Sequence, residues 1–122
     1  MTLSQYAALA AFNSQTLAIL DQRRNTFEQR RNSLLPALQS IGLKVDAPPQ
    51  GAFYIYADCR QILTDKYRDS MALSKYYLQQ AGVAVTPGND FGHYLAESHI
   101  RFAYTANEQR LLQAIERIKH II

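Results

Sequence analysis

The sequence predicts an α+β domain in which helices cover one face of a small sheet. Apolar residues recur at three- and four-residue steps through residues 14–41 and again after residue 105, which indicates amphipathic helices. Between these stretches, residues 52–57 (Ala-Phe-Tyr-Ile-Tyr-Ala) alternate with a period of two and are rich in aromatic residues, as in a strand. The chain has 122 residues, of which 48% are hydrophobic, and this is enough for one domain with its own core.

Two helices are expected at the N-terminal end, over about residues 3–12 and about residues 14–41. Pro36 removes a backbone donor and is expected to bend the second helix, and Gly42 supplies its C-terminal cap. The core-facing stripe of that helix is predicted to comprise Leu17, Leu20, Phe27, Leu34, Leu38 and Ile41, with Arg24 and Arg31 in the same register. This helix therefore has one face for the core and two arginines at its edge.

Three further elements are expected in the middle of the chain. Residues 43–45 and 83–85 are candidates for short strands, and residues 58–69 are polar and loop-like. A helix is predicted over residues 70–81, closed by Gly82. The order of helices and strands therefore differs from a regular alternation, as expected of an α+β domain.

The C-terminal end predicts a strand followed by a helix. The strand is His99–Thr105 (His-Ile-Arg-Phe-Ala-Tyr-Thr), and Thr105 with Glu108 forms the pattern of a capping box for the helix. The buried stripe of this last helix is predicted to be Leu111, Leu112, Ile115, Ile118 and Ile122.

Arg101 is a candidate binding residue because of its place in the predicted strand. Alternation puts Ile100, Phe102 and Tyr104 on one face and Arg101, with Ala103 and Thr105, on the other. A guanidinium is planar and permanently charged, and it binds a carboxylate through two parallel hydrogen bonds. Arg101 could therefore bind an acidic substrate, or it could pair with a carboxylate of its own chain, such as Asp90.

Composition limits the other classes of function. The net charge is +3, and basic residues are spread through the chain except for two arginine pairs, which is weak evidence for a polyanionic partner. Cys59 is the one cysteine, and His93, His99 and His120 lack metal-ligand spacing, so neither a disulfide nor a metal site is expected. Neither a secretory signal nor a membrane span fits the N-terminal residues. We expect a cytoplasmic protein.

Several segments taken together resemble the C-terminal small domain of fold type I pyridoxal-phosphate aminotransferases of class I/II. They are Arg30-Arg31-Asn32 with Leu38 and Gly42-Leu43, then Pro49–Tyr54, then Leu78 with Ala81–Gly88 and Phe91-Gly92, then Ile100–Tyr104 and the closing helix. The resemblance implies a mostly antiparallel sheet. It also implies that Arg101 binds the α-carboxylate of the substrate. The loop of Pro87, Gly88, Asn89, Phe91 and Gly92 would lie near the substrate entrance.

The same resemblance implies which parts of such an enzyme this chain lacks. Transamination needs a Schiff-base lysine and an acidic partner for the cofactor, pyridoxal phosphate, and in the family both precede this region. Ser74-Lys75 imitates the cofactor site but stands in a helical setting without the pattern that follows the family's lysine. We therefore expect no catalytic or cofactor-binding residue in this chain, which would be inactive in isolation.

The implied parent enzyme would be a homodimer that acts on an amino acid and a 2-oxo acid. Residues 1–13 would border its large, cofactor-binding domain, and residues 14–122 would form its small domain. A stand-alone regulatory or interaction domain derived from an aminotransferase has the same motifs and stays an alternative. The aromatic run of residues 50–56 and a pI of about 9.1 faintly suggest an RNA-binding module. That run lacks its leading basic residue and a second aromatic strand, so no nucleic-acid partner is expected.

Overall fold

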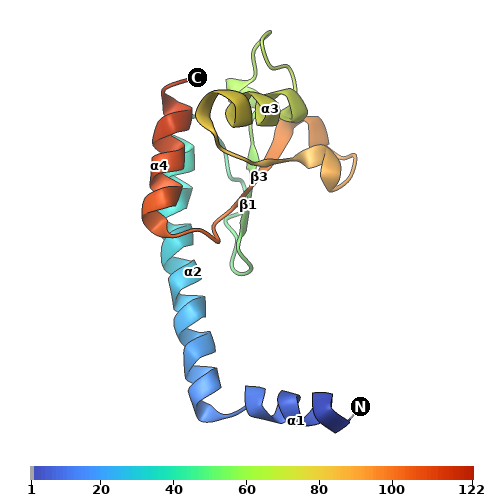
Figure 1. Cartoon of the computed structure of the whole chain (residues 1–122). Helices are drawn as coiled ribbons and strands as arrows, with labels where there is room; N and C mark the ends of the chain where they lie inside the picture. The colour runs from blue at the N-terminus through green and yellow to red at the C-terminus, as the bar shows by residue number, and fades with distance from the viewer. Residues whose placement is uncertain (1) are drawn as a thin grey trace.

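The computed structural model describes residues 2–122 and confirms the α+β class. Its elements are α1 (Thr2–Ala11), α2 (Ser14–Ser40), β1 (Tyr54–Asp58), α3 (Ser70–Ala81), β2 (Thr86–Pro87), β3 (His99–Ala103) and α4 (Glu108–Lys119), with short 3-10 turns at Arg60–Ile62, Gly88–Asp90 and Ala96–Ser98. In Figure 1, α4 lies along the C-terminal half of α2, and the sheet and α3 lie beside this pair. α1 extends away from the far end of α2.

The sheet has three strands in the order β1-β3-β2, and both pairings are antiparallel. Tyr56 of β1 pairs with Arg101 of β3, and Thr86 of β2 pairs with the same arginine from the other side. Successive side chains of a strand point to opposite faces. The central strand therefore presents Arg101 on one face, between two neighbours, and buries Ile100 and Phe102 on the other.

The core fills the space between one face of the sheet and three helices. The buried residues at its centre are Leu34 and Leu38 of α2, Ile55 and Ala57 of β1, Leu73 and Tyr77 of α3, Ile100 and Phe102 of β3, and Ile115 and Ile118 of α4. The helices contribute apolar residues at three- and four-residue spacing, so each buries one stripe. As predicted, helices cover one face of the sheet, and no α-helix within residues 2–122 covers the opposite face.

The helix caps agree with the sequence in α3 and differ in α4. α3 spans Ser70–Ala81 as predicted, and Gly82 ends it with φ +64°, a conformation that glycine adopts without strain. At the start of α4, the side chain of Asn107 accepts a hydrogen bond of 2.9 Å from the backbone N–H of Arg110. The predicted Thr105 cap is therefore wrong. Glu108 instead accepts a hydrogen bond from Ser33 Oγ, which ties α4 to α2.

Leu112 and Ile122, predicted in the buried stripe of the last helix, and the two predicted short strands also differ from prediction. Leu112 is 38% exposed because α2 and α3 cover only the stripe with Leu111, and Ile122 lies past the end of the helix at Lys119. Residues 43–45 form one bridge, Lys44 with Asp58, rather than a strand. Residues 83–85 are not a strand either, because pairing begins only at β2.

The N-terminal arm, residues 2–25, lies apart from this core, which α2 reaches at Phe27. Every side chain of α1 is exposed, including Leu3 at 88% and Phe12, just beyond the helix, at 75%. Leu17 and Leu20 were predicted to face the core but are about half exposed, because the sheet and α4 reach only the C-terminal half of α2 (Figure 1). Within residues 2–122, no helix has the length and hydropathy that a membrane span requires.

Candidate functional site

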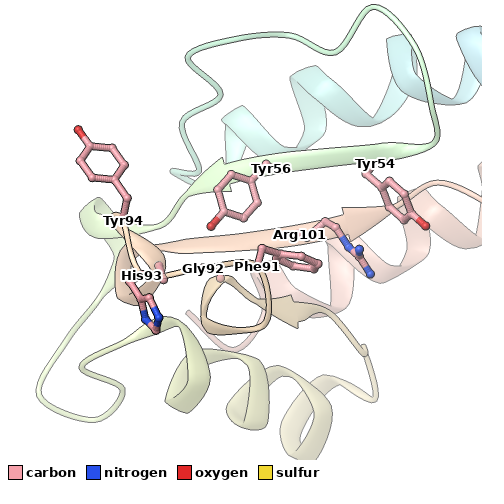
Figure 2. Close-up of a pocket in the computed structure, with 9 residues that line it drawn as sticks. Tyr54, Tyr56, Phe91, Gly92, His93, Tyr94 and Arg101 are labelled. Carbon is pink, nitrogen blue, oxygen red and sulfur yellow. The ribbon is translucent and has the colours of Figure 1, made fainter.

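A hollow of about 510 Å³ lies on the helix-free face of the sheet (Figure 2). Its lining comprises Tyr54, Tyr56, Gly88, Phe91, Gly92, His93, Tyr94, Ala96 and Arg101. The aromatic rings come from β1 and from the loop after β2, and the cation comes from β3. The structure therefore brings Arg101 together with Gly88, Phe91 and Gly92 of the predicted entrance loop.

Arg101 is half-buried at one end of this hollow, with its guanidinium between the rings of Tyr54 and Phe91 (Figure 2). Its Cζ atom is 4.2 Å from the centroid of the Tyr54 ring and 4.4 Å from that of Phe91. Nη2 donates a hydrogen bond of 3.2 Å to Thr86 Oγ1 on the neighbouring strand. Nε is buried and makes no hydrogen bond within residues 2–122. The cation is thus held by aromatic and hydroxyl contacts.

Arg101 has no carboxylate partner within residues 2–122. The five ion pairs of this part of the chain involve other residues, and Asp90 is in none of them. A buried or half-buried charge is ordinarily paired, because its transfer out of water is costly. The pairing of Arg101 with its own chain, which the sequence left open, is therefore not what the structure shows.

The entrance loop is fixed to the sheet and to α3 by close packing. A Cβ atom on Gly88 would clash with the carbonyl oxygen of Ala96 and lie 2.6 Å from the hydroxyl of Tyr56, so this position requires glycine. The hydroxyl of Ser70, at the start of α3, donates 2.8 Å to the Ala96 carbonyl and lies 3.1 Å from the side-chain amide of Asn89. These contacts place the loop beside Arg101. Pro87 precedes them in β2 and is buried.

A series of ring contacts connects the entrance loop with β1 and β3. The rings of Phe91 and Tyr56 make an edge-to-face contact, with 6.2 Å between their centroids and an interplanar angle of 89°. The Tyr56 ring stacks on His99 at 4.9 Å. Burial raises the pKa of the Tyr56 hydroxyl, so this group is neutral near pH 7 and can donate a hydrogen bond.

Sequence reasoning missed the part that Tyr54 and Tyr56 play in this hollow. Their period-two spacing in residues 52–57 predicts a strand, but the sequence does not indicate which strand pairs with it. Antiparallel pairing of Tyr56 with Arg101 brings the two tyrosines to the face of the cation. Residues i and i+2 of a strand share a face, so Tyr54 and Tyr56 are expected on the same side of β1. Only the pairing of β1 with β3 shows that this side is the one that carries Arg101.

The other reactive groups near this region are engaged or inert. Asp58, at the end of β1, accepts hydrogen bonds of 3.1 and 2.8 Å from Arg60 Nε, and these bonds lower the pKa of its carboxyl group. Burial raises the pKa of the Cys59 thiol to about 12, so it stays protonated. His93 and Tyr94 lie at the end of the hollow remote from Arg101 (Figure 2).

None of the four lysines lines the hollow. Lys75 is exposed on α3, and Lys119 is exposed at the end of α4. Lys66 Nζ donates 2.8 Å to the hydroxyl of Tyr76, and Lys44 pairs with Asp46. A Schiff base needs an amine at the reacting centre. No lysine of residues 2–122 therefore lies where it could form a Schiff base inside this hollow.

Comparison with known proteins identifies the family of this fold and this hollow. The family model for aminotransferase class I and II matches residues 1–118. The chain therefore belongs to the aminotransferase class I and II family, whose cofactor is pyridoxal phosphate, and the resemblance seen in the sequence is confirmed.

Individual relatives show how much of such an enzyme the chain represents. Aspartate/prephenate aminotransferase of Thermus thermophilus is 35% identical over 123 residues, which cover 99% of this chain and 30% of that protein. The crystal structure of an aminotransferase from Mycobacterium tuberculosis matches with a TM-score of 0.84, at 34% identity over 98% of this chain and 30% of the other. Aspartate aminotransferase from Thermus thermophilus with maleate matches with a TM-score of 0.82, at 34% identity over 99% and 30%. The chain thus spans about 30% of the length of these relatives.

Proposed function

We propose that this chain supplies the substrate-carboxylate site of a pyridoxal-phosphate aminotransferase, which transfers an amino group between an amino acid and a 2-oxo acid. Arg101 would bind the α-carboxylate that both substrates share. The observation that carries the proposal is a guanidinium in an open hollow, oriented by Tyr54, Phe91 and Thr86, with no carboxylate of residues 2–122 to pair with. Such a cation is arranged for an anion that comes from outside.

The entrance loop gives the carboxylate its surroundings. Gly88 and Gly92 bring backbone close to the hollow, Asn89 and Pro87 connect the loop to α3 and the sheet, and Phe91 adds apolar surface beside the cation. The Phe91 ring covers part of the guanidinium, and a charge-assisted hydrogen bond is stronger where water is excluded. The names of the Thermus relatives support a carboxylate ligand, since aspartate, prephenate and maleate all carry carboxylates.

The cofactor and its lysine would come from a large domain outside this chain. That domain would cover the helix-free face of the sheet, and the N-terminal arm with residues 1–13 would border it. A homodimer is proposed for the assembled enzyme. Uncovered, the arm leaves Leu3, Tyr6, Leu9 and Phe12 in water, at a cost of about 25 cal/mol for each Å² of apolar surface. This exposure supports a partner surface.

By itself the chain is predicted to be catalytically inactive, because its lysines lie outside the hollow. The test is to mix the 122-residue chain with pyridoxal phosphate, reduce with borohydride and map the labelled lysines. Scattered, substoichiometric labelling is expected. Stoichiometric labelling of Lys75, together with amino-group transfer, would show that this chain carries its own cofactor site.

The carboxylate site is tested by binding of pyruvate, the smallest common 2-oxo acid. Addition of pyruvate to the ¹⁵N-labelled chain should shift the guanidinium resonances of Arg101. The Arg101→Gln variant keeps a polar side chain but removes the charge and the paired donors, and should lose pyruvate binding. Arg23→Gln, on the exposed arm helix, is the matched control and should bind as the natural chain does. Equal binding by all three proteins would contradict the proposal.

A further inference from the structure

The two rings on Arg101 come from different kinds of structure. Tyr54 belongs to β1, which pairs with β3 along its length, so the sheet fixes its backbone. Phe91 belongs to the entrance loop and is 48% exposed. Aromatic faces attract a guanidinium and stack on it. We call this pair of rings the aromatic clamp. Since Tyr54 lies in a paired strand and Phe91 in an exposed loop, Phe91 is the member that can be changed with little effect on the sheet.

The nitrogen atoms of Arg101 differ in their access to the hollow. Nε is buried without a hydrogen-bond partner in the described chain, and Nη2 donates to Thr86 Oγ1. Nη1 makes no hydrogen bond within residues 2–122 and is not among the buried, unpartnered atoms. A carboxylate in the hollow therefore meets the edge formed by Nη1 and Nη2. Two parallel N–H donors at one edge match the two oxygens of a carboxylate.

We propose, on the basis of the function proposed above, that Phe91 is a positioning residue that keeps Arg101 in this orientation. Its ring shields Nε and presents the Nη1–Nη2 edge, so that substrate carboxylates bind end-on. Phe91 is itself held by its edge contact with Tyr56, which stacks on His99. The entrance loop thus orients the binding residue as well as bordering the hollow.

The experiment compares Phe91→Leu with Phe91→Tyr in the 122-residue chain. Leu keeps an apolar side chain but loses the ring, whereas Tyr keeps the ring and adds a hydroxyl, so Phe91→Tyr is the matched conservative control. The first measurement is the rate at which the Nε proton of Arg101 exchanges with water, without ligand. The second is the affinity for pyruvate. Phe91→Leu is expected to speed exchange about tenfold or more and to weaken pyruvate binding about three- to tenfold, and Phe91→Tyr to change both by less than about twofold.

The outcomes separate this proposal from the proposed function. If Phe91→Leu leaves Nε exchange unchanged while the natural chain binds pyruvate, the positioning role is wrong and the carboxylate site stands. If the ring controls Nε exchange but pyruvate shifts no Arg101 resonance in the natural chain, the proposed function and end-on binding are both wrong. Methyl signals of Ile100 and Ile115 report whether the core is intact. If they move in Phe91→Leu, then Phe91→Met repeats the comparison.

Discussion

The two faces of β3 carry different properties of this protein, although their residues alternate along one strand. Ile100 and Phe102 pack beneath the helices and are buried, whereas Arg101 between them lies on the open face, half-buried in the hollow. Burying one large aliphatic side chain contributes about 1.5 to 3 kcal/mol. A cation over an aromatic ring at a partly exposed site contributes about 0.5 to 1 kcal/mol. The covered face therefore supplies stability, and the open face can supply binding at little cost to it.

The largest effect is expected from a cavity on the covered face of β3. Ile100→Ala removes a fully buried side chain from the centre of the core, where neighbours on the sheet and helices cannot fill the space. We expect the free energy of unfolding to fall by about 2 to 5 kcal/mol. Urea denaturation followed by circular dichroism measures this. Pyruvate binding by the fraction that stays folded should be nearly unchanged, and a parallel loss of binding would mean that the two faces are coupled.

The second largest effect is expected on the open face, when Arg101 loses its planar guanidinium. Arg101→Lys keeps the charge but loses the planar pair of donors. In the enzyme assembled with its cofactor domain, loss of one charge-assisted hydrogen bond, about 1.5 to 3 kcal/mol, should lower kcat/KM roughly ten- to a hundredfold. The melting temperature should change little. Unchanged kinetics with a large fall in melting temperature would instead assign Arg101 to stability.

A smaller effect concerns pH, through the buried carboxylate of Asp58 at the end of β1. Hydrogen bonds from Arg60 lower the pKa of Asp58 in the folded state. A carboxyl group of this kind stabilises the fold above its unfolded pKa, about 3.9, and the contribution is lost as pH falls through the folded pKa. Unfolding measured between about pH 2 and pH 6 should show this loss. Asp58→Asn and Arg60→Gln should both flatten the pH dependence, and a profile unchanged in both variants would exclude this pair as its source.

The smallest expected effect concerns the apolar surface of the N-terminal arm, which no part of the described chain covers. The apolar side chains of the N-terminal arm should drive weak self-association of the 122-residue chain. Light scattering over a concentration series should show a mass that rises with concentration, and a chain that begins at Asn13 should associate less. A natural chain that stays monomeric at the highest concentration would show that this surface does not drive self-association.

Sequence reasoning succeeded where local chemistry decides the outcome. The helix at Ser70–Ala81 was predicted to the residue, because Gly82 permits the left-handed conformation that ends it. The strand around Arg101 begins at His99 and alternates as predicted, because alternation needs only the neighbouring residues, but it ends at Ala103 rather than Thr105. Capping of α4 was misassigned, since both Thr105 and Asn107 carry a suitable side chain and only the chain path selects Asn107.

The sequence by itself determined the α+β class, the family, the two faces of β3 and Arg101 as the candidate for a carboxylate. Only the tertiary structure decided what surrounds that arginine. Tyr54 is 47 residues away in sequence and meets Arg101 through the antiparallel pairing of β1 with β3. Tertiary structure also decided that Leu17 and Leu20 are about half exposed although they continue the stripe of Leu34 and Leu38. The physical reason is the same in both cases: periodicity fixes which residues share a face, but what covers that face depends on segments distant in the chain.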